Sequence, residues 1–340
     1  MVGEAVEAVK LGRRGPVVSR FCLGLLPLSR LQSNLPRGEA VRLVEEALEA
    51  GVTFFDTAEL YETYWLVRQA LGPPAVVATK AYAYTYGGMR DSLRRALDET
   101  GRERIDIFLL HEQESRLTLA GHAAALRCLV EAREAGVVGA VGVSTHAPEV
   151  VAAAAEMEEI DVIHPLVNHR GLGLLGGTLQ DMLTALEKAG RAGKGIYAMK
   201  VLGGGHLGAA AEEAFAFVRS LEHVHAVAVG VKSREELLYD LALLRGERPS
   251  AELARAVAGR RRFLFIEEHC GGCGECVGAC RHGALELVPA EGLLRTPGPG
   301  EGNGGPPERG RRLRVRVDMA RCVLCGYCAA ACRDFCIKVV

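Results

Sequence analysis

The sequence predicts an α/β fold, a (β/α)8 TIM barrel followed by a small α+β domain. Before residue 250, apolar runs typical of strands alternate about eight times with amphipathic helical runs. Titratable residues stand where several of these strands end. Regularly spaced cysteines begin only after the last repeat. Eight strand–helix units in about 250 residues match the size of a barrel, whose functional residues lie at the carboxyl ends of its strands.

The composition is that of an ordinary globular protein: of 340 residues, 49% are hydrophobic and 24% charged. A net charge of −1 creates no strong field, so we expect no nucleic acid and no membrane as partner. Residues 1–14 lack the apolar segment of a signal peptide, and the early apolar run 21–28 is too short to cross a bilayer. Regular cysteines without such a signal favour metal or cluster binding in a reducing compartment, so we expect a cytoplasmic protein.

Changes in composition divide the chain into three parts. Residues 1–20 are charged and contain glycine and proline, which predicts an N-terminal arm or hairpin. The repeating pattern, 21–250, forms the barrel. Residues 263–340 form a separate cysteine-rich domain. Within it, residues 289–312 are dense in Gly, Pro and Arg and predict a flexible insert, because they cannot bury enough apolar surface to become ordered.

The predicted strands begin near Phe21, Val52, Ala75, Ile105, Val137, Val162, Gly195 and Val224. Helical stretches lie between them, and the first places Ala40, Val44 and Ala47 on one apolar stripe. The clearest helices are 37–50, 88–99, 119–135, 178–192 and 234–245. The alternative, a doubly wound sheet, usually has a glycine-rich turn after its first strand. Here that turn reads Pro27-Leu28-Ser29-Arg30, which favours the barrel.

Four residues near strand ends are the candidate catalytic group. Asp56 closes the second strand, and Tyr61 follows it by five residues. Lys80 closes the third strand and His111 the fourth. A lysine ammonium near a phenol lowers the phenol pKa from its usual value of about 10, and a carboxylate beside the lysine keeps it charged. Such a group can protonate a carbonyl oxygen while hydride reaches the carbon, with the histidine donating to the same oxygen.

These residues resemble the tetrad of the aldo-keto reductases, which has Asp, Tyr, Lys and His in this order and on these strands. The resemblance covers roughly residues 10–250. It implies interconversion of a small carbonyl or alcohol substrate with NADP(H) or NAD(H), which the family binds without a Rossmann motif. The positions that it assigns to the cofactor are Ser144, Asn168, Lys200, Lys232, Ser233 and Arg234.

The sequence departs from this family at three positions near the site. Glu62 follows the tyrosine where the family often has glycine, and Thr145 follows Ser144 where it usually has asparagine. The glutamine that often supports the nicotinamide near strand six is not evident, and His164 is the nearest polar candidate.

The eight regular cysteines form two quartets, each with the spacing C-x2-C-x2-C-x3-C. This resembles the bacterial two-cluster ferredoxin domain. The resemblance implies that Cys270, Cys273, Cys276 and Cys332 hold one [4Fe-4S] cluster and that Cys322, Cys325, Cys328 and Cys280 hold the other. Zinc is the rival metal, although zinc sites usually pair two C-x2-C elements. Outside the quartets, Cys336 is an alternative ligand, and Cys22 and Cys128 are expected in the core.

Three interpretations of the whole chain remain open, because a nicotinamide gives two electrons as hydride and a cluster takes one. A flavin normally bridges this difference, and no flavin motif is recognisable. The favoured interpretation is an NADP-dependent oxidoreductase of the aldo-keto reductase type, whose clusters are structural, regulatory or a docking module for a redox protein. The second is a ferredoxin-like carrier whose barrel is a partner-binding or vestigial scaffold. In the third, electrons pass from the clusters to a substrate in the barrel.

Overall fold

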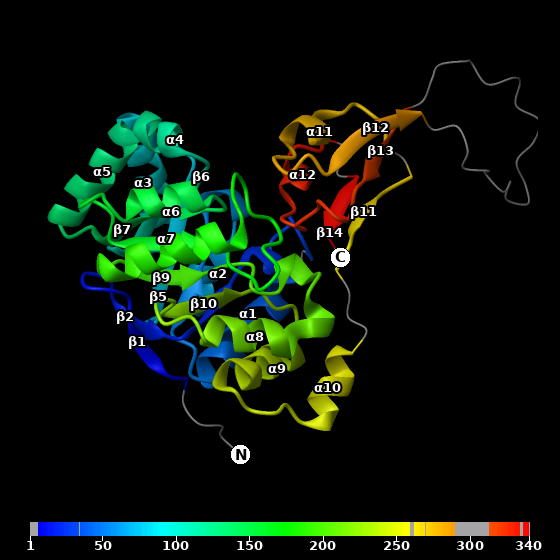
Figure 1. Cartoon of the computed structure of the whole chain (residues 1–340), viewed down its shortest axis with the longest axis horizontal. Helices are drawn as coiled ribbons and strands as arrows, with labels where there is room; N and C mark the ends of the chain where they lie inside the picture. The colour runs from blue at the N-terminus through cyan, green and yellow to red at the C-terminus, as the bar shows by residue number, and fades with distance from the viewer. Residues whose placement is uncertain are drawn as a thin grey trace, which may run out of the picture. The chain divides into compact units, whose positions relative to one another are not determined.

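The computed structural model describes residues 6–33, 35–258, 262–268, 270–289, 313–333 and 336–339. The chain divides into two compact units, Met1–Arg262 and Phe263–Val340 (Figure 1). Residues 290–312 of the predicted flexible insert lie outside the described residues.

The first unit is a closed barrel of eight parallel strands. Each strand pairs with the next along the chain, and the last pairs with the first. This confirms the predicted (β/α)8 barrel, and the strands begin close to the predicted positions. They are β3 (Phe21–Gly24), β4 (Phe54–Asp56), β5 (Val76–Ala81), β6 (Ile105–Gln113), β7 (Val138–Thr145), β8 (Val162–Pro165), β9 (Gly195–Ala198) and β10 (Ala226–Val229).

Helices follow the strands and surround the barrel (Figure 1). One prediction was wrong in detail: the stretch 119–135 is two helices, because His122 (φ −97°, ψ 8°) ends the first and begins the second. No helix in the described part of the chain is long and apolar enough to cross a membrane. The α-helices are α1 (Arg37–Glu49), α2 (Tyr64–Ala70), α3 (Tyr86–Thr100), α4 (Arg116–Gly121), α5 (Ala123–Glu134), α6 (Pro148–Ala154), α7 (Leu179–Arg191), α8 (Ala211–Arg219), α9 (Arg234–Arg245) and α10 (Ala251–Val257). The 3-10 helices among the described residues are η1 (Leu26–Leu28), η2 (Glu59–Tyr61), η3 (Gly203–Gly205) and η4 (Gly208–Ala210).

The barrel is preceded by an antiparallel hairpin of β1 (Ala8–Lys10) and β2 (Val17–Ser19). Its turn residue Leu11 is buried among the side chains that fill the barrel interior. The next residue, Gly12, has φ +60°, and a Cβ there would lie 2.3 Å from the backbone nitrogen of Gly195. Glycine therefore lets the hairpin pack against the start of β9 and cover that end of the barrel.

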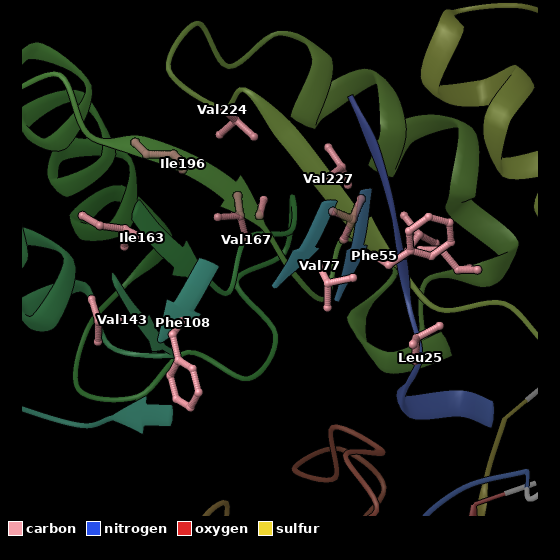
Figure 2. Close-up of a cluster of buried hydrophobic side chains, with 14 of the residues drawn as sticks. Leu25, Phe55, Val77, Phe108, Val143, Ile163, Val167, Ile196, Val224 and Val227 are labelled. Atoms are coloured by element: carbon pink, nitrogen blue, oxygen red, sulfur yellow. The ribbon is translucent and has the colours of Figure 1, made fainter. Parts of the chain in front are cut away.

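Alternation along the strands divides the apolar side chains between two layers. Phe54 on β4 and Leu109 on β6 belong to the barrel interior. Phe55 and Phe108, one residue away from them, belong to the larger layer between the strands and the helices. Figure 2 shows this outer layer, to which successive strands each contribute a hydrophobic side chain. Because successive residues point to opposite faces, each strand position has a defined side, and this also decides where the polar residues point.

The second unit is small and mixes helices with two-stranded sheets. β11 (Leu264–Ile266) pairs with β14 (Ile337–Val339), and β12 (Leu285–Pro289) pairs with β13 (Leu313–Val317), both antiparallel. Its described residues also form two short helices, α11 (Glu275–Ala279) and α12 (Tyr327–Ala330). Its apolar cluster includes Leu264, Leu285, Leu324 and Ile337 together with two of the quartet cysteines.

Candidate functional site

Strand alternation turns three of the four tetrad residues into the barrel. Asp56 lies two positions after Phe54, Lys80 two after Ala78, and His111 two after Leu109, so each shares the inward face of an apolar interior residue. The three strands are neighbours around the barrel. All three side chains are almost inaccessible to solvent, at 5%, 1% and 1% exposure in that order. These three residues therefore occupy one polar layer above the apolar interior.

The centre of this layer is the Lys80 ammonium group. Its Nζ donates to Asp56 Oδ1 at 2.6 Å and to the backbone carbonyl of Thr57 at 2.8 Å. A buried charge is costly unless it is paired and hydrogen-bonded, and both conditions are met here. The Lys80 Nζ is thus paired and hydrogen-bonded in a site that is closed to solvent.

Tyr61 comes from η2, directly after β4, and completes the group. The Lys80 Nζ lies 4.9 Å from the centroid of the Tyr61 ring. The ring of His111 meets the Tyr61 ring edge-on, with centroids 5.8 Å apart. The structure thus brings Asp56, Tyr61, Lys80 and His111 together, as their order along the chain predicted.

Two further side chains reach Asp56 from the other side of the barrel. The Tyr197 hydroxyl on β9 donates to Asp56 Oδ2 at 3.0 Å. His164 on β8 stacks on the Tyr197 ring, with centroids 3.8 Å apart, and its Nε2 lies 3.8 Å from the same oxygen. His164 is therefore enclosed beside Asp56. Sequence reasoning missed Tyr197, whose side chain belongs to the barrel interior. The period-two alternation along β9 was the signal that could have found it.

A second polar group borders His111. Tyr82, two residues after Lys80, stacks on the His111 ring at 4.2 Å between centroids, and its hydroxyl donates to Glu112 Oε2 at 2.7 Å. Glu112 has φ +44°, an unusual conformation for a residue other than glycine. Its N–H donates to Ser144 Oγ at 2.8 Å. Ser144, assigned to the cofactor by resemblance, therefore holds the turn that follows His111.

Asn168 and Lys200, also assigned to the cofactor, are joined through the backbone. The Asn168 Nδ2 donates to the carbonyls of Leu172 at 2.9 Å and Lys200 at 3.4 Å. Its Oδ1 accepts from the N–H groups of Arg170 and Leu172. These four bonds use the full capacity of the amide. Asn168 thus shapes its own loop and ties it to Lys200, which has φ +60°.

Lys232, Ser233 and Arg234 surround the beginning of α9. Ser233 Oγ accepts from the N–H of Glu236 at 3.3 Å, and the N–H of Lys232 donates to Glu236 Oε2 at 2.8 Å. Ser233 therefore caps an N–H group in the first turn of the helix, and the Glu236 side chain binds the N–H group just before the helix. The Arg234 side chain is exposed, with its Nε 3.8 Å from Glu46 Oε1.

Arg262, which sequence reasoning missed, joins this region. Its guanidinium donates to the carbonyl of Gly230 at 2.8 Å and lies 3.5 Å from Glu236 Oε2. Its Cβ also packs against Gly205, where a side chain would meet it at 3.0 Å. Arg262 therefore bridges the loops that follow β9 and β10, where barrels commonly bind phosphate.

In the second unit, electrostatic coupling groups the cysteines across the two quartets. Burial, and then electrostatic interaction with Cys270, Cys273 and Cys332, raise the pKa of the Cys276 thiol to about 11. Cys332 belongs to the second quartet in sequence but neighbours the first in space. This is the interleaving that two-cluster domains show.

The other group mirrors the first. Burial, and then Cys325, Cys322 and Cys280, raise the pKa of the Cys328 thiol, with a smaller effect of Cys276. In the part of the chain that the structure describes, no three His, Cys, Asp or Glu side chains converge as ligands of a single metal ion. A [4Fe-4S] cube binds its four cysteines at four different iron atoms, so its ligands stand further apart.

Backbone N–H groups reach the two crossover sulfurs in the same way. The N–H of Ala284 donates to Cys280 Sγ at 3.3 Å, and the N–H of Cys336 donates to Cys332 Sγ at 3.2 Å. Hydrogen bonds to sulfur tune cluster potentials. Cys336 is buried and follows Cys332 by four residues, as Ala284 follows Cys280.

Comparison with known proteins agrees with both units. Residues 20–254 match the aldo/keto reductase family, and residues 269–335 match the 4Fe-4S dicluster domain. A 6-dehydroglucose reductase from Novosphingobium aromaticivorans is 28% identical over 163 residues, which cover 42% of this chain and 53% of that protein. The methylglyoxal reductase DkgA of Escherichia coli O157:H7 is 24% identical over 176 residues, 48% of this chain and 63% of that protein. The chain thus spans about half to two thirds of the length of these curated relatives.

Solved structures share the fold at low sequence identity. A Pseudomonas aeruginosa structure assigned to the aldo-keto reductases superposes with a TM-score of 0.63 and 22% identity, covering 72% of this chain and 97% of that one. A Bacillus halodurans aldo-keto reductase gives a TM-score of 0.59 and 17% identity, covering 74% and 95%. The family match, the barrel and the two cysteine groups together show that this chain belongs to the aldo/keto reductase family and carries a 4Fe-4S dicluster domain.

Proposed function

We propose that the barrel interconverts a small carbonyl compound and its alcohol with NADP(H) or NAD(H). Tyr61 is the general acid that protonates the carbonyl oxygen, and the base in the reverse direction. Lys80 lowers the pKa of the Tyr61 phenol, Asp56 anchors Lys80, and His111 donates to the carbonyl oxygen. The family match and the reductase names of the two relatives support this reaction class.

The observation that carries the proposal is the burial of Lys80 between Asp56 and Tyr61. A surface lysine would act weakly on a phenol, because water screens its charge. Lys80 is 1% exposed, and its Nζ faces the Tyr61 ring. A nearby cation in a dry site stabilises the phenolate and so brings the phenol pKa toward neutral pH, where a general acid–base group works best.

The loops after β9 and β10 suit a dinucleotide. In η3 the three glycines have φ of 57°, 73° and 118°, a left-handed backbone conformation that favours glycine and carries no side chains over its N–H groups. The capped start of α9 offers N–H groups with a positive dipole end, and Lys232, Arg234 and Arg262 add charge. A bound reduced nicotinamide would supply the hydride. Arg234 and Lys232 favour a 2′-phosphate, so we propose NADP(H) as the preferred cofactor.

For the second unit we propose two [4Fe-4S] clusters with the interleaved ligands named above. The coupling of Cys276 to Cys332 and of Cys328 to Cys280 supports this assignment. The clusters would supply one-electron carriers, and a redox protein would be their partner. We further propose a cytoplasmic location, because reduced thiolates are needed to hold the clusters.

The test is carbonyl reduction by the anaerobic, cluster-loaded protein. NADPH oxidation would be followed with a panel of small aldehydes and ketones, for wild type and Tyr61→Phe. We expect Tyr61→Phe to lose activity by a factor of about 10² to 10⁴, the usual size of a general-acid contribution, with the cluster absorbance unchanged. Tyr84→Phe, which alters an exposed tyrosine, is the control. Equal activity of wild type and Tyr61→Phe would contradict the proposal, and no activity in either would favour the electron-carrier interpretation.

A further inference from the structure

The Asp56 carboxylate is held from two sides. Lys80 Nζ binds Oδ1 at 2.6 Å, and the Tyr197 hydroxyl binds Oδ2 at 3.0 Å. We propose that Tyr197 is a positioning residue for Asp56, and that its hydrogen bond determines how strongly Lys80 acts on Tyr61. This inference rests on the proposed role of Tyr61 as the general acid.

The Tyr197 ring has little freedom to turn away from Asp56. It is fully buried and lies between two other rings. Phe54 packs on it at 5.0 Å between centroids, with the planes tilted by 58°. His164 stacks on it at 3.8 Å, with the planes tilted by 14°. The hydroxyl is therefore aimed at the carboxylate by the packing of the barrel interior, without the entropy cost of ordering a mobile side chain.

His164 supports this arrangement without competing for Asp56. Its Nδ1 lies 2.7 Å from the backbone carbonyl of Tyr197, which can only accept, so Nδ1 carries the proton. Burial lowers the pKa of His164 to about 4, with Asp56 opposing this effect, so the ring is neutral at physiological pH. Its Nε2 then has only a lone pair and lies 3.8 Å from Asp56 Oδ2, beyond hydrogen-bond distance. The donor to Oδ2 is therefore Tyr197.

The effect on Tyr61 follows from charge compensation. The negative charge of Asp56 weakens the electrostatic effect of the Lys80 ammonium on the Tyr61 phenol. A hydroxyl that donates to Oδ2 neutralises part of that negative charge, so more of the Lys80 field reaches the phenol. Burial, and then Asp56, raise the pKa of Tyr197, which keeps its proton on the oxygen as a donor. Loss of the hydroxyl should therefore raise the pKa of Tyr61.

Tyr197→Phe removes one hydroxyl and replaces no other titratable group around Asp56 and Tyr61. The titratable side chains that face Asp56 are Lys80, His164, Tyr197 and Cys22. Those that face Tyr61 are Lys80, His111 and Tyr197. Burial, and then Asp56, raise the pKa of Cys22, so it remains a neutral thiol. Removing the Tyr197 hydroxyl changes no formal charge among them, so a shift at Tyr61 reports the hydrogen bond.

The experiment compares Tyr197→Phe with Tyr64→Phe. Tyr64 is equally buried, and its hydroxyl bonds Thr79 Oγ1 at 2.8 Å on the outer side of the strands, away from the tetrad. Both variants lose one buried hydroxyl. We expect Tyr197→Phe to move the acidic group in the pH profile of kcat/KM to a higher pKa and to lower kcat about tenfold. Tyr64→Phe should leave the profile in place.

A second measurement needs no turnover. The tyrosinate absorbance would be titrated in the wild type and in Tyr61→Phe, and the difference between them gives the Tyr61 pKa. The same difference in the Tyr197→Phe background should give a higher value. Tyr197→3-fluorotyrosine keeps the ring and hydroxyl but makes it a stronger donor, so it should shift the Tyr61 pKa downward and covers the case in which Tyr197→Phe does not fold.

The outcomes separate this inference from the proposed function. Opposite shifts in Tyr197→Phe and Tyr197→3-fluorotyrosine support it. An unchanged Tyr61 pKa in a folded variant at position 197 overturns it, as does an equal shift in Tyr64→Phe. If the wild type reduces no carbonyl, the proposed function fails, but the difference titration still decides whether Tyr197 acts on Tyr61 through Asp56.

Discussion

The Lys80 ammonium lies over the face of the Tyr61 ring, 4.9 Å from its centroid, while it donates to Asp56 at 2.6 Å. Three separate elements create this contact: β4 carries Asp56, η2 carries Tyr61 and β5 carries Lys80. A cation in contact with a ring face is stabilised by it, and this stabilisation grows when water is excluded. The contact therefore links the stability of the barrel to the chemistry of its site.

Substitutions of Asp56 and of Lys80 should have strongly non-additive effects on the free energy of unfolding. Asp56→Asn leaves an uncompensated buried cation, and Lys80→Met leaves an uncompensated buried carboxylate, so each should cost about 3–5 kcal/mol. The double variant Asp56→Asn/Lys80→Met should be more stable than either, because no unpaired charge remains. Denaturant unfolding of all four proteins gives the coupling energy. Additive single effects would contradict a direct ion pair.

The pH dependence of stability should contain a contribution from Asp240 on α9. Burial, and then Glu236, raise the pKa of Asp240 from 3.8 to about 8, with Arg262 opposing them. Between these values the unfolded chain ionises while the folded chain keeps the proton. The unfolding free energy of the wild type should therefore fall with rising pH, relative to Asp240→Asn, by about 1.4 kcal/mol per pH unit.

The measurement is denaturant unfolding of wild type and Asp240→Asn at several pH values from 5 to 8. Above pH 8 the difference between the two should become constant. Asp98→Asn, at an exposed position on α3, is the matched control and should show no such slope. A difference that does not vary with pH would show that Asp240 is ionised in the folded protein.

We expect Cys332 to be a cluster ligand and Cys336 to be a core residue that binds no iron. Cys332 is coupled to Cys276, whereas Cys336 is buried and gives its N–H to the Cys332 sulfur. Cys332→Ser should therefore lower the iron and sulfide content by up to half, through loss of one cluster. Cys336→Ala keeps the backbone N–H and should retain both. Loss of iron in Cys336→Ala would instead make Cys336 a ligand.

Glycine should be required at position 272 but not at its neighbour. Gly272 has φ +68°, and a Cβ there would lie 2.2 Å from the carbonyl oxygen of Leu313. A Cβ at Gly271 would meet nothing within 4 Å. We expect Gly272→Ala to lower the melting temperature of the cluster absorbance, because the left-handed backbone alone costs about 1–2 kcal/mol for other residues. Gly271→Ala should have no effect.

At the equivalent position of the second quartet, a side chain is accommodated despite a left-handed backbone. Leu324 has φ +50°, yet it packs into the apolar cluster of the unit. Burial of a leucine side chain offsets a strained backbone there. Equal melting temperatures for Gly272→Ala and Gly271→Ala would contradict the prediction and would mean that β13 shifts to make room for the added methyl group.

NADPH alone should not bleach the clusters. Hydride carries two electrons, each cluster accepts one, and the sequence shows no recognisable flavin motif. An anaerobic titration with NADPH, followed by dithionite as a positive control, measures this in the visible absorbance. Bleaching by NADPH would contradict the prediction and would direct attention to a bound flavin.

Much of the fold and the tetrad could be read from the sequence, because both depend on local patterns. The alternation of strand and helix character predicted the eight-stranded barrel, which the structure confirms. Asp56, Lys80 and His111 end strands of that pattern, and parallel strands bring their carboxyl ends together. The repeated cysteine spacing likewise predicted the iron–sulfur unit, which the family match confirms.

The partners of these residues were decided by the tertiary structure. Asp56 and Tyr197 are far apart in sequence, and only closure of the barrel places their strands in one layer. Ser144 and Asn168 bind backbone groups that no spacing reveals, and Arg262 reaches the loop of Gly230 from beyond the last barrel helix. The alternation of residues along a strand determines which face of that strand a side chain lies on. Its contacts with other elements depend on the distances between those elements, and only the packing of the whole chain sets these distances.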